Sequence, residues 1–122
     1  MILADTSVWV DFFRGGDARF ARCLQRGEIA LHPFVLGELA LGHIKDRSAT
    51  LADLHALPAA ALASDGEVRF LIESAPLYGR GIGYVDAALL ASVRLQTELR
   101  LWTRDKRLGA AAEQTGIALV EP

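Results

Sequence analysis

The sequence contains a single cysteine, Cys23, among its 122 residues. One cysteine cannot form an internal disulfide, and it excludes structural zinc or iron–sulfur sites built from several cysteines. We therefore expect a cytoplasmic protein in which Cys23 is a small buried hydrophobic residue on a helix.

The sequence also lacks a long hydrophobic run. No apolar stretch approaches the roughly 20 residues that a membrane-spanning helix requires. The first five residues have no basic region ahead of their apolar stretch, so no signal peptide and no membrane association are expected. Hydrophobic residues nevertheless make up 52% of the chain, and no repeat or low-complexity segment interrupts it. This composition argues against disorder and predicts one domain over residues 1–122.

An excess of positive charge is absent as well. Thirteen Lys and Arg residues face fifteen Asp and Glu residues, a formal net charge of −2. A module that only coats nucleic acid is usually basic, so the charge balance argues against such a module. It does not exclude a nuclease, because acidic residues can be concentrated in a metal site.

Short apolar segments alternate with helical segments along the chain. Strands are expected at residues 1–4, 28–31, 99–103 and 117–120, and helices at 7–13, 17–26, 33–41, 48–57, 64–77, 84–98 and 105–115. This alternation predicts an α/β fold with a mainly parallel sheet. In such sheets, functional sites form beyond the carboxyl ends of the strands.

Four acidic residues have no obvious cationic partner. Asp5 and Asp105 follow predicted strands, whereas Glu38 and Asp86 lie on predicted helices with apolar or glycine neighbours three and four positions away. A carboxylate among aliphatic side chains is costly unless it is paired or bound to a metal. Gathered carboxylates suit Mg²⁺ or Mn²⁺, which activate water and polarise phosphodiesters.

Each of these acids also has a purely structural explanation. Asp5 and Asp105 could cap the helices that follow them, Glu38 could face solvent, and Asp86 could complement the dipole of its helix. The charge count favours a site, because without these four acids thirteen cations face eleven acids, a net charge of +2. That balance is compatible with a polyanionic substrate, but the residues alone leave the alternatives open.

Four segments in order along the chain resemble the motifs of PIN domains, specifically the VapC-type toxins of bacterial toxin–antitoxin pairs. They are residues 2–9, 35–39, 81–91 and 102–108, and they contain the four acids. The resemblance covers essentially the whole chain and implies a PIN-like three-layer α/β/α fold. It further implies a metal-dependent endoribonuclease, homodimeric and inhibited by a VapB-type antitoxin whose C-terminal segment enters the active site through a groove. It does not specify which RNA is cleaved.

Three hydroxyl residues match polar positions near the acids of this family: Thr6, Ser7 and Thr103. We expect them to orient the carboxylates by hydrogen bonds. Helix capping by Thr6 and the strand preference of Thr103 are the structural alternatives.

We expect Asp5 and Asp86 to bind Mg²⁺ or Mn²⁺ directly, and Glu38 and Asp105 to complete the site directly or through water. The alternative is a non-catalytic PIN-fold protein that acts through dimer and antitoxin contacts. The intact set of four acids disfavours that alternative.

The antitoxin groove is expected between two helices, residues 17–26 and 33–41. They combine apolar side chains with flanking arginines: Phe20, Leu24, Phe34 and Leu36 with Arg19, Arg22 and Arg26. The alternative is that all these apolar side chains face the core.

Overall fold

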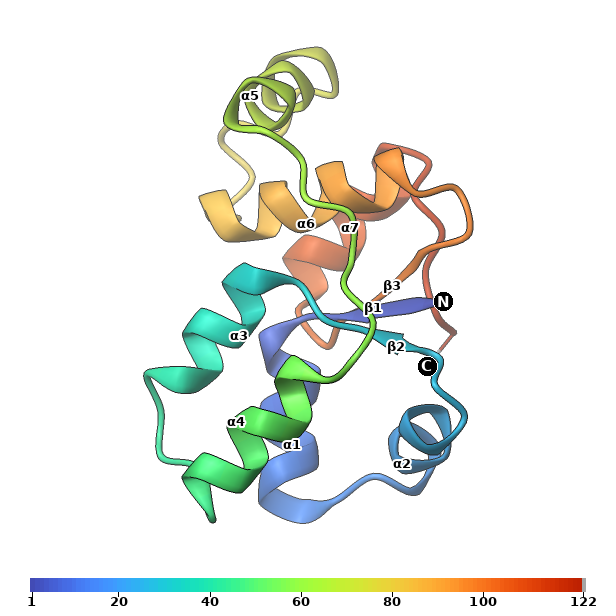
Figure 1. Ribbon diagram of the computed structural model, residues 1–122. Helices are drawn as coiled ribbons and strands as arrows, with labels where there is room; N and C mark the ends of the chain where they lie inside the picture. Colours follow the sequence, from blue (N-terminus) through green and yellow to red (C-terminus); the bar gives the residue numbers. More distant parts are fainter. Residues whose placement is uncertain (122) are drawn as a thin grey trace.

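The structure, a computed structural model, describes residues 1–121 and contains a parallel sheet with helices on both sides (Figure 1). Its strands are β1 (Ile2–Ala4), β2 (Ile29–Ala30) and β3 (Arg100–Trp102). Its helices are α1 (Thr6–Gly15), α2 (Ala18–Gln25), α3 (Pro33–Ala40), α4 (Arg47–His55), α5 (Asp65–Ser74), α6 (Tyr84–Leu95) and α7 (Lys106–Gln114). The strand order is β2-β1-β3, with parallel pairing throughout. The predicted α/β class with a mainly parallel sheet is confirmed.

The helices form two layers around the strands. In Figure 1, α1, α2 and α4 lie below the sheet, and α6 and α7 lie above it. Helix α5 packs on α6 and is farther from the strands. The arrangement agrees with the three-layer α/β/α architecture that the resemblance implied.

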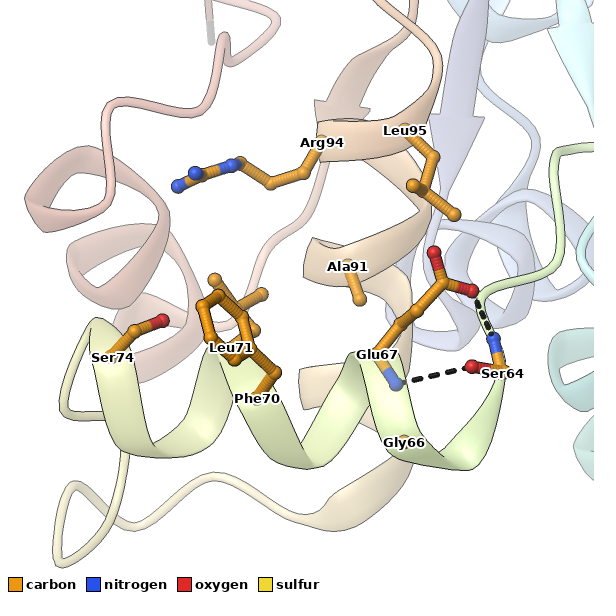
Figure 2. A pocket seen from close by; sticks show the side chains of 9 residues that line it. All are labelled: Ser64, Gly66, Glu67, Phe70, Leu71, Ser74, Ala91, Arg94 and Leu95. Atoms are coloured by element: carbon orange, nitrogen blue, oxygen red, sulfur yellow. Dashed lines mark hydrogen bonds between the residues drawn. The ribbon is translucent and has the colours of Figure 1, made fainter.

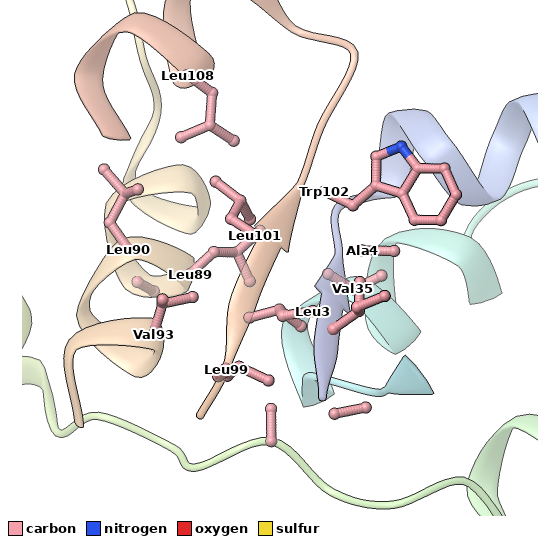
Figure 3. Close-up of a cluster of buried hydrophobic side chains, with 14 of the residues drawn as sticks. Leu3, Ala4, Val35, Leu89, Leu90, Val93, Leu99, Leu101, Trp102 and Leu108 are labelled. Atoms are coloured by element: carbon pink, nitrogen blue, oxygen red, sulfur yellow. The ribbon is translucent and has the colours of Figure 1, made fainter. Parts of the chain in front are cut away.

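The central strand β1 organises the core. Leu3 on β1 and Leu101 on β3 pair in register and are fully buried. Helix α6 covers this part of the sheet, and all its residues from Ala87 to Val93 are buried (Figure 3). Each large aliphatic side chain buried here stabilises the fold by about 1.5–3 kcal/mol. The nearly continuous apolar character of this helix therefore predicted its burial correctly.

The expected strand at residues 117–120 was wrong. This segment makes only one isolated parallel bridge, between Leu119 and Leu101. Its hydrogen bonds with β3 are those of Leu101 N–H to Ala118 O and of Val120 N–H to Leu101 O. Strand β3 therefore pairs along its whole length with β1 but meets this segment only around Leu101. The expected strand at residues 28–31 is likewise shorter, and Leu31 forms an isolated bridge with Ala59 instead.

Two helices end earlier than the sequence predicted. Helix α6 stops at Leu95 rather than at residue 98, because Gln96 is extended (φ −118°, ψ 96°) and its side-chain oxygen accepts a hydrogen bond from Ala61 N–H. Helix α5 ends at Ser74 because Pro76 disfavours helical geometry in the residue before it. The remaining helix ends lie within two residues of the expected ones, the usual uncertainty of helix boundaries.

No helix within residues 1–121 is long and apolar enough to cross a bilayer. Cys23 is a free, half-buried thiol on α2, and burial raises its pKa. Cys23 therefore lies on a helix, as predicted, but it is only partly buried.

Candidate active site

The carboxyl ends of β1 and β3 bring two of the predicted acids to one edge of the sheet. Asp5 directly follows β1, and its N–H donates to the carbonyl of Trp102, the last residue of β3. Thr103 and Asp105 lie in the turn that leads from β3 to α7. The parallel pairing of the two strands is therefore what places these residues together.

Asp5 is buried, with 4% of its surface exposed. Its Oδ1 accepts hydrogen bonds from Ser7 Oγ (2.5 Å) and Val8 N–H (3.2 Å). Its Oδ2 accepts one from Thr103 Oγ1. Asp5 thus caps α1, as the structural alternative stated, and the same carboxylate is oriented by two hydroxyl residues from different parts of the chain.

The two hydroxyls that hold Asp5 are themselves held by neighbouring amides. Arg104 N–H donates to Ser7 Oγ (3.1 Å), and Asp105 N–H donates to Thr103 Oγ1 (3.0 Å). Two consecutive backbone N–H groups of one turn therefore hold the two hydroxyls, and each hydroxyl in turn holds one carboxylate oxygen of Asp5. Ser7 and Thr103 make the orienting contacts that were predicted for them.

Glu38 lies on the exposed face of α3. Its Oε1 accepts a 2.6 Å hydrogen bond from Thr6 Oγ1. The solvent-facing alternative is correct for its exposure, but the contact with Thr6 directs the carboxylate toward the start of α1, beside Asp5. Thr6 therefore orients Glu38 rather than Asp5.

Asp86 lies half-buried in the first turn of α6, where its Oδ2 accepts a hydrogen bond from Gly83 N–H (3.2 Å). Burial raises the pKa of Asp86, the Gly83 hydrogen bond opposes that rise, and the negative charges of Asp105, Asp5 and Glu38 add to it. The four predicted acids therefore share one electrostatic environment.

Asp105 is exposed and caps α7. Its Oδ1 accepts hydrogen bonds from Arg107 N–H (2.8 Å) and Leu108 N–H (3.2 Å). The capping alternative is therefore correct. Capping uses one oxygen, and within the described residues Oδ2 has no hydrogen-bond partner.

No group of three or more His, Cys, Asp or Glu side chains in residues 1–121 is arranged as a ready-made metal site. The donor chemistry nevertheless fits a hard divalent cation, because every candidate ligand is a carboxylate. None of the four acids forms a salt bridge in the part of the chain that the structure describes. Within residues 1–121, therefore, no cationic side chain lies within salt-bridge distance of any of the four acids.

The contacts of one cationic residue of this region, Arg104, were not identified from the sequence. Its Nε lies 2.9 Å from Asp11 Oδ2, and its Nη2 lies 2.7 Å from Asp17 Oδ2. The sequence offers only its position between Thr103 and Asp105 as a signal.

Two large grooves lie on the described surface, one beside Asp105 and one away from the four acids. A groove of about 580 Å³ runs along α7 and includes Thr103, Arg104 and Asp105. Another, of about 540 Å³, lies between α5 and α6, where Phe70 and Leu71 face Ala91 and Leu95 (Figure 2). We place the chemistry at the acids, because the second groove holds none of them.

The expected wall of the antitoxin groove requires a correction. Phe20 is fully buried, since its ring packs edge-on against Trp9 (4.8 Å between centroids) and Trp102 (5.5 Å). It belongs to the core and cannot line a groove. Phe34 on α3 is exposed, as expected.

Comparison with known proteins supplies an independent line of argument. The PIN domain family matches residues 2–114. Ribonuclease VapC32 from each of two strains of Mycobacterium tuberculosis is 49% identical over 124 residues, covering 99% of this chain and 98% of the relative.

Two solved structures are similar in fold. FitAcB from Neisseria gonorrhoeae matches 100% of this chain and 98% of its own, with a TM-score of 0.66 and 21% identity. PAE2754 from Pyrobaculum aerophilum matches 90% of this chain and 83% of its own, with a TM-score of 0.61 and 20% identity. At such low identity these likenesses concern the fold alone.

Proposed function

This chain is a VapC-type member of the PIN-domain family, and from that membership we propose that it is a metal-dependent endoribonuclease, the toxin of a VapBC-type toxin–antitoxin pair. RNA is the proposed substrate, and the cytoplasm is the proposed location. The sequence similarity to a ribonuclease over almost the whole chain supports the reaction class.

The observation that carries the proposal is the shared environment of four carboxylates without a salt-bridge partner in residues 1–121. We propose that Asp5 and Asp86 bind Mg²⁺ or Mn²⁺ directly, and that Glu38 and Asp105 complete the site directly or through water. Such an ion, when bound, polarises the phosphodiester and stabilises the leaving oxygen.

The residues of this chain would hold the ligands in place. Ser7 and Thr103 orient the Asp5 carboxylate, and Thr6 orients Glu38. Because these hydroxyls donate to carboxylate oxygens, they fix the directions in which the two carboxylates point. No serine, cysteine or histidine nucleophile is needed.

The test is RNA cleavage with Mg²⁺ or Mn²⁺, with and without a chelator. Asp5→Asn and Asp86→Asn should each lower the rate by roughly 100-fold or more, because removal of a metal ligand costs at least as much as loss of its hydrogen-bond partner. Asp53→Asn, the same change on an exposed residue of α4, serves as the control. Full activity in both site variants, or cleavage in excess chelator, would contradict the metal mechanism.

The same assay separates the proposal from a non-catalytic interaction protein. A wild-type chain that binds its partner but cleaves no RNA under any metal condition would favour the interaction protein. No feature of the site supports that alternative over the nuclease.

We also propose a homodimer and a VapB-type antitoxin as partners. Exposed apolar side chains near the groove between α5 and α6, among them Phe70 (73% exposed) and Leu95 (48%), support an association surface. Light scattering on Phe70→Glu and wild type measures whether this surface holds a dimer. A dimer unaffected by the substitution would assign the contact elsewhere.

The antitoxin is proposed to place a cation among the acids. An arginine there would form charge-assisted hydrogen bonds with the carboxylates that bind metal. Partner affinity should therefore fall as Mg²⁺ is added at constant ionic strength. Unchanged affinity would place the inhibitory contact outside the metal site.

A further inference from the structure

Arg104 joins the first two helices of the chain to a turn that is distant from them in the sequence. It lies in the turn between β3 and α7, and its guanidinium contacts Asp11 on α1 and Asp17, the N-cap of α2. The two contacts use different nitrogens, Nε and Nη2, at 2.9 Å and 2.7 Å. Because the guanidinium is planar and rigid, this double contact fixes the direction from which the side chain approaches.

The backbone of the same turn holds the two hydroxyl groups that form hydrogen bonds with Asp5. Arg104 N–H donates to Ser7 Oγ, and Asp105 N–H donates to Thr103 Oγ1. Those hydroxyls donate in turn to Oδ1 and Oδ2 of Asp5. A shift of the turn would therefore move the Thr103 hydroxyl and break the Arg104 N–H hydrogen bond that holds the Ser7 hydroxyl, and so release the Asp5 carboxylate from its present orientation.

A stabilising role or a role in substrate binding explains the Arg104 contacts less well than a positioning role does. The paired side chains are substantially exposed (41% for Arg104, 53% for Asp11 and 22% for Asp17), and exposed ion pairs contribute little to stability. A role in binding RNA phosphate is also disfavoured, since two carboxylates already neutralise the guanidinium. Positioning is what the geometry provides.

We propose that Arg104 is a positioning residue: its contacts with Asp11 and Asp17 hold the 103–105 turn so that the Ser7 and Thr103 hydroxyls orient Asp5 for metal binding. This inference rests on the proposed function for its kinetic consequence, but its structural part can be tested without activity.

The first experiment measures amide hydrogen exchange in the metal-free protein. In Arg104→Gln, the amides of residues 104 and 105 should exchange roughly tenfold faster or more, because their hydrogen bonds to the hydroxyls loosen. Arg104→Lys keeps the positive charge but not the planar guanidinium that makes two contacts, so exchange at residues 104 and 105 should lie between that of wild type and that of Arg104→Gln. Asp11→Ala removes one partner at an exposed helical position and should act in the same direction.

The matched control is Arg69→Gln, which removes an exposed arginine paired with Asp65 on α5. Exchange at residues 104 and 105 should be the same in this variant as in wild type. Equal exchange in wild type, Arg104→Gln and Asp11→Ala would overturn the proposal.

The second experiment measures Mn²⁺ binding without RNA, followed by cleavage kinetics. Arg104→Gln should bind Mn²⁺ about 3- to 10-fold more weakly and lower kcat about tenfold, with the KM for RNA within about twofold of wild type. A raised, salt-dependent KM with unchanged kcat would overturn the proposal and make Arg104 an RNA contact. Absence of RNA cleavage by wild type would refute the proposed function, while the exchange result would still decide whether Arg104 positions the turn.

Discussion

Thr6 Oγ1 donates a 2.6 Å hydrogen bond to Glu38 Oε1, joining the first residue of α1 to the exposed face of α3. This contact explains how an exposed acid can serve a site at the sheet edge. Thr6 follows Asp5 directly, so the backbone that holds one proposed ligand also carries the hydroxyl that orients another.

Removing the Thr6 hydroxyl should therefore weaken catalysis more than stability. Thr6→Val should lower the rate of RNA cleavage roughly tenfold, since a lost hydrogen bond to a charged group costs about 1.5 kcal/mol. Thr50→Val is the matched control, because the hydroxyl of Thr50 on α4 donates to the backbone carbonyl of Lys45, just before that helix, instead of to a carboxylate. Equal rates in both variants would remove Thr6 from the site.

Because the pKa of Asp86 is raised, replacing this residue with asparagine should stabilise the protein by an amount that depends on pH. Burial and neighbouring carboxylates raise the pKa of Asp86, so the folded protein binds this proton more tightly than the unfolded chain does. Stability from this group is present at low pH and is lost as pH rises through the folded pKa. Asp86→Asn should therefore raise the Tm of the metal-free protein at pH 7, with a smaller gain at pH 4. Thermal unfolding at the two pH values measures this, and a Tm lowered at both would contradict it.

The stability that His32 contributes should depend on pH in the opposite direction. Its ring is fully buried, Nδ1 accepts from Phe34 N–H (3.0 Å), and burial lowers the pKa of the imidazole. The unfolded chain then binds the proton more tightly, so the stability from this group is complete above about pH 6.5 and declines below it. His32→Asn keeps a capping oxygen but cannot charge. Urea unfolding at pH 7.5 and 5.5 should show a smaller loss of free energy in this variant than in wild type.

A side chain at position 81 should destabilise the protein. The φ of Gly81 is +77°, and a Cβ would lie 3.0 Å from the Cδ and Nη1 atoms of Arg107. Gly81→Ala should therefore cost about 1–2 kcal/mol of unfolding free energy, from the left-handed backbone and the displaced arginine. Gly37→Ala, on an open helical face of α3, should instead stabilise the protein by about 0.5–1 kcal/mol. Denaturant unfolding measures both, and equal effects would contradict the argument.

The elements whose apolar residues form continuous runs could be predicted from the sequence. Helix α6 was expected to be deeply buried, and it is. Asp5 and Asp105 could be placed at the same sheet edge because parallel strands end together, and this followed from the order of elements alone.

Contacts between distant segments could not be predicted in the same way. Arg104 meets Asp17 across 87 positions of sequence, and Gln96 ends α6 by bonding a residue 35 positions away. Phe20 was expected in the wall of the antitoxin groove because arginines flank it on its helix, but its aromatic partners bury it in the core. The positions of the four acids as metal ligands remain a prediction.

Asp5 and Asp105 each cap a helix with Oδ1, and each belongs to the proposed site. The rotamer of each carboxylate is therefore set when α1 and α7 form, before any ion or RNA arrives. The entropy of orienting these ligands is lost during folding rather than during binding. Alanine at either position would remove a cap and a ligand together, whereas asparagine retains a capping oxygen and removes only the charge.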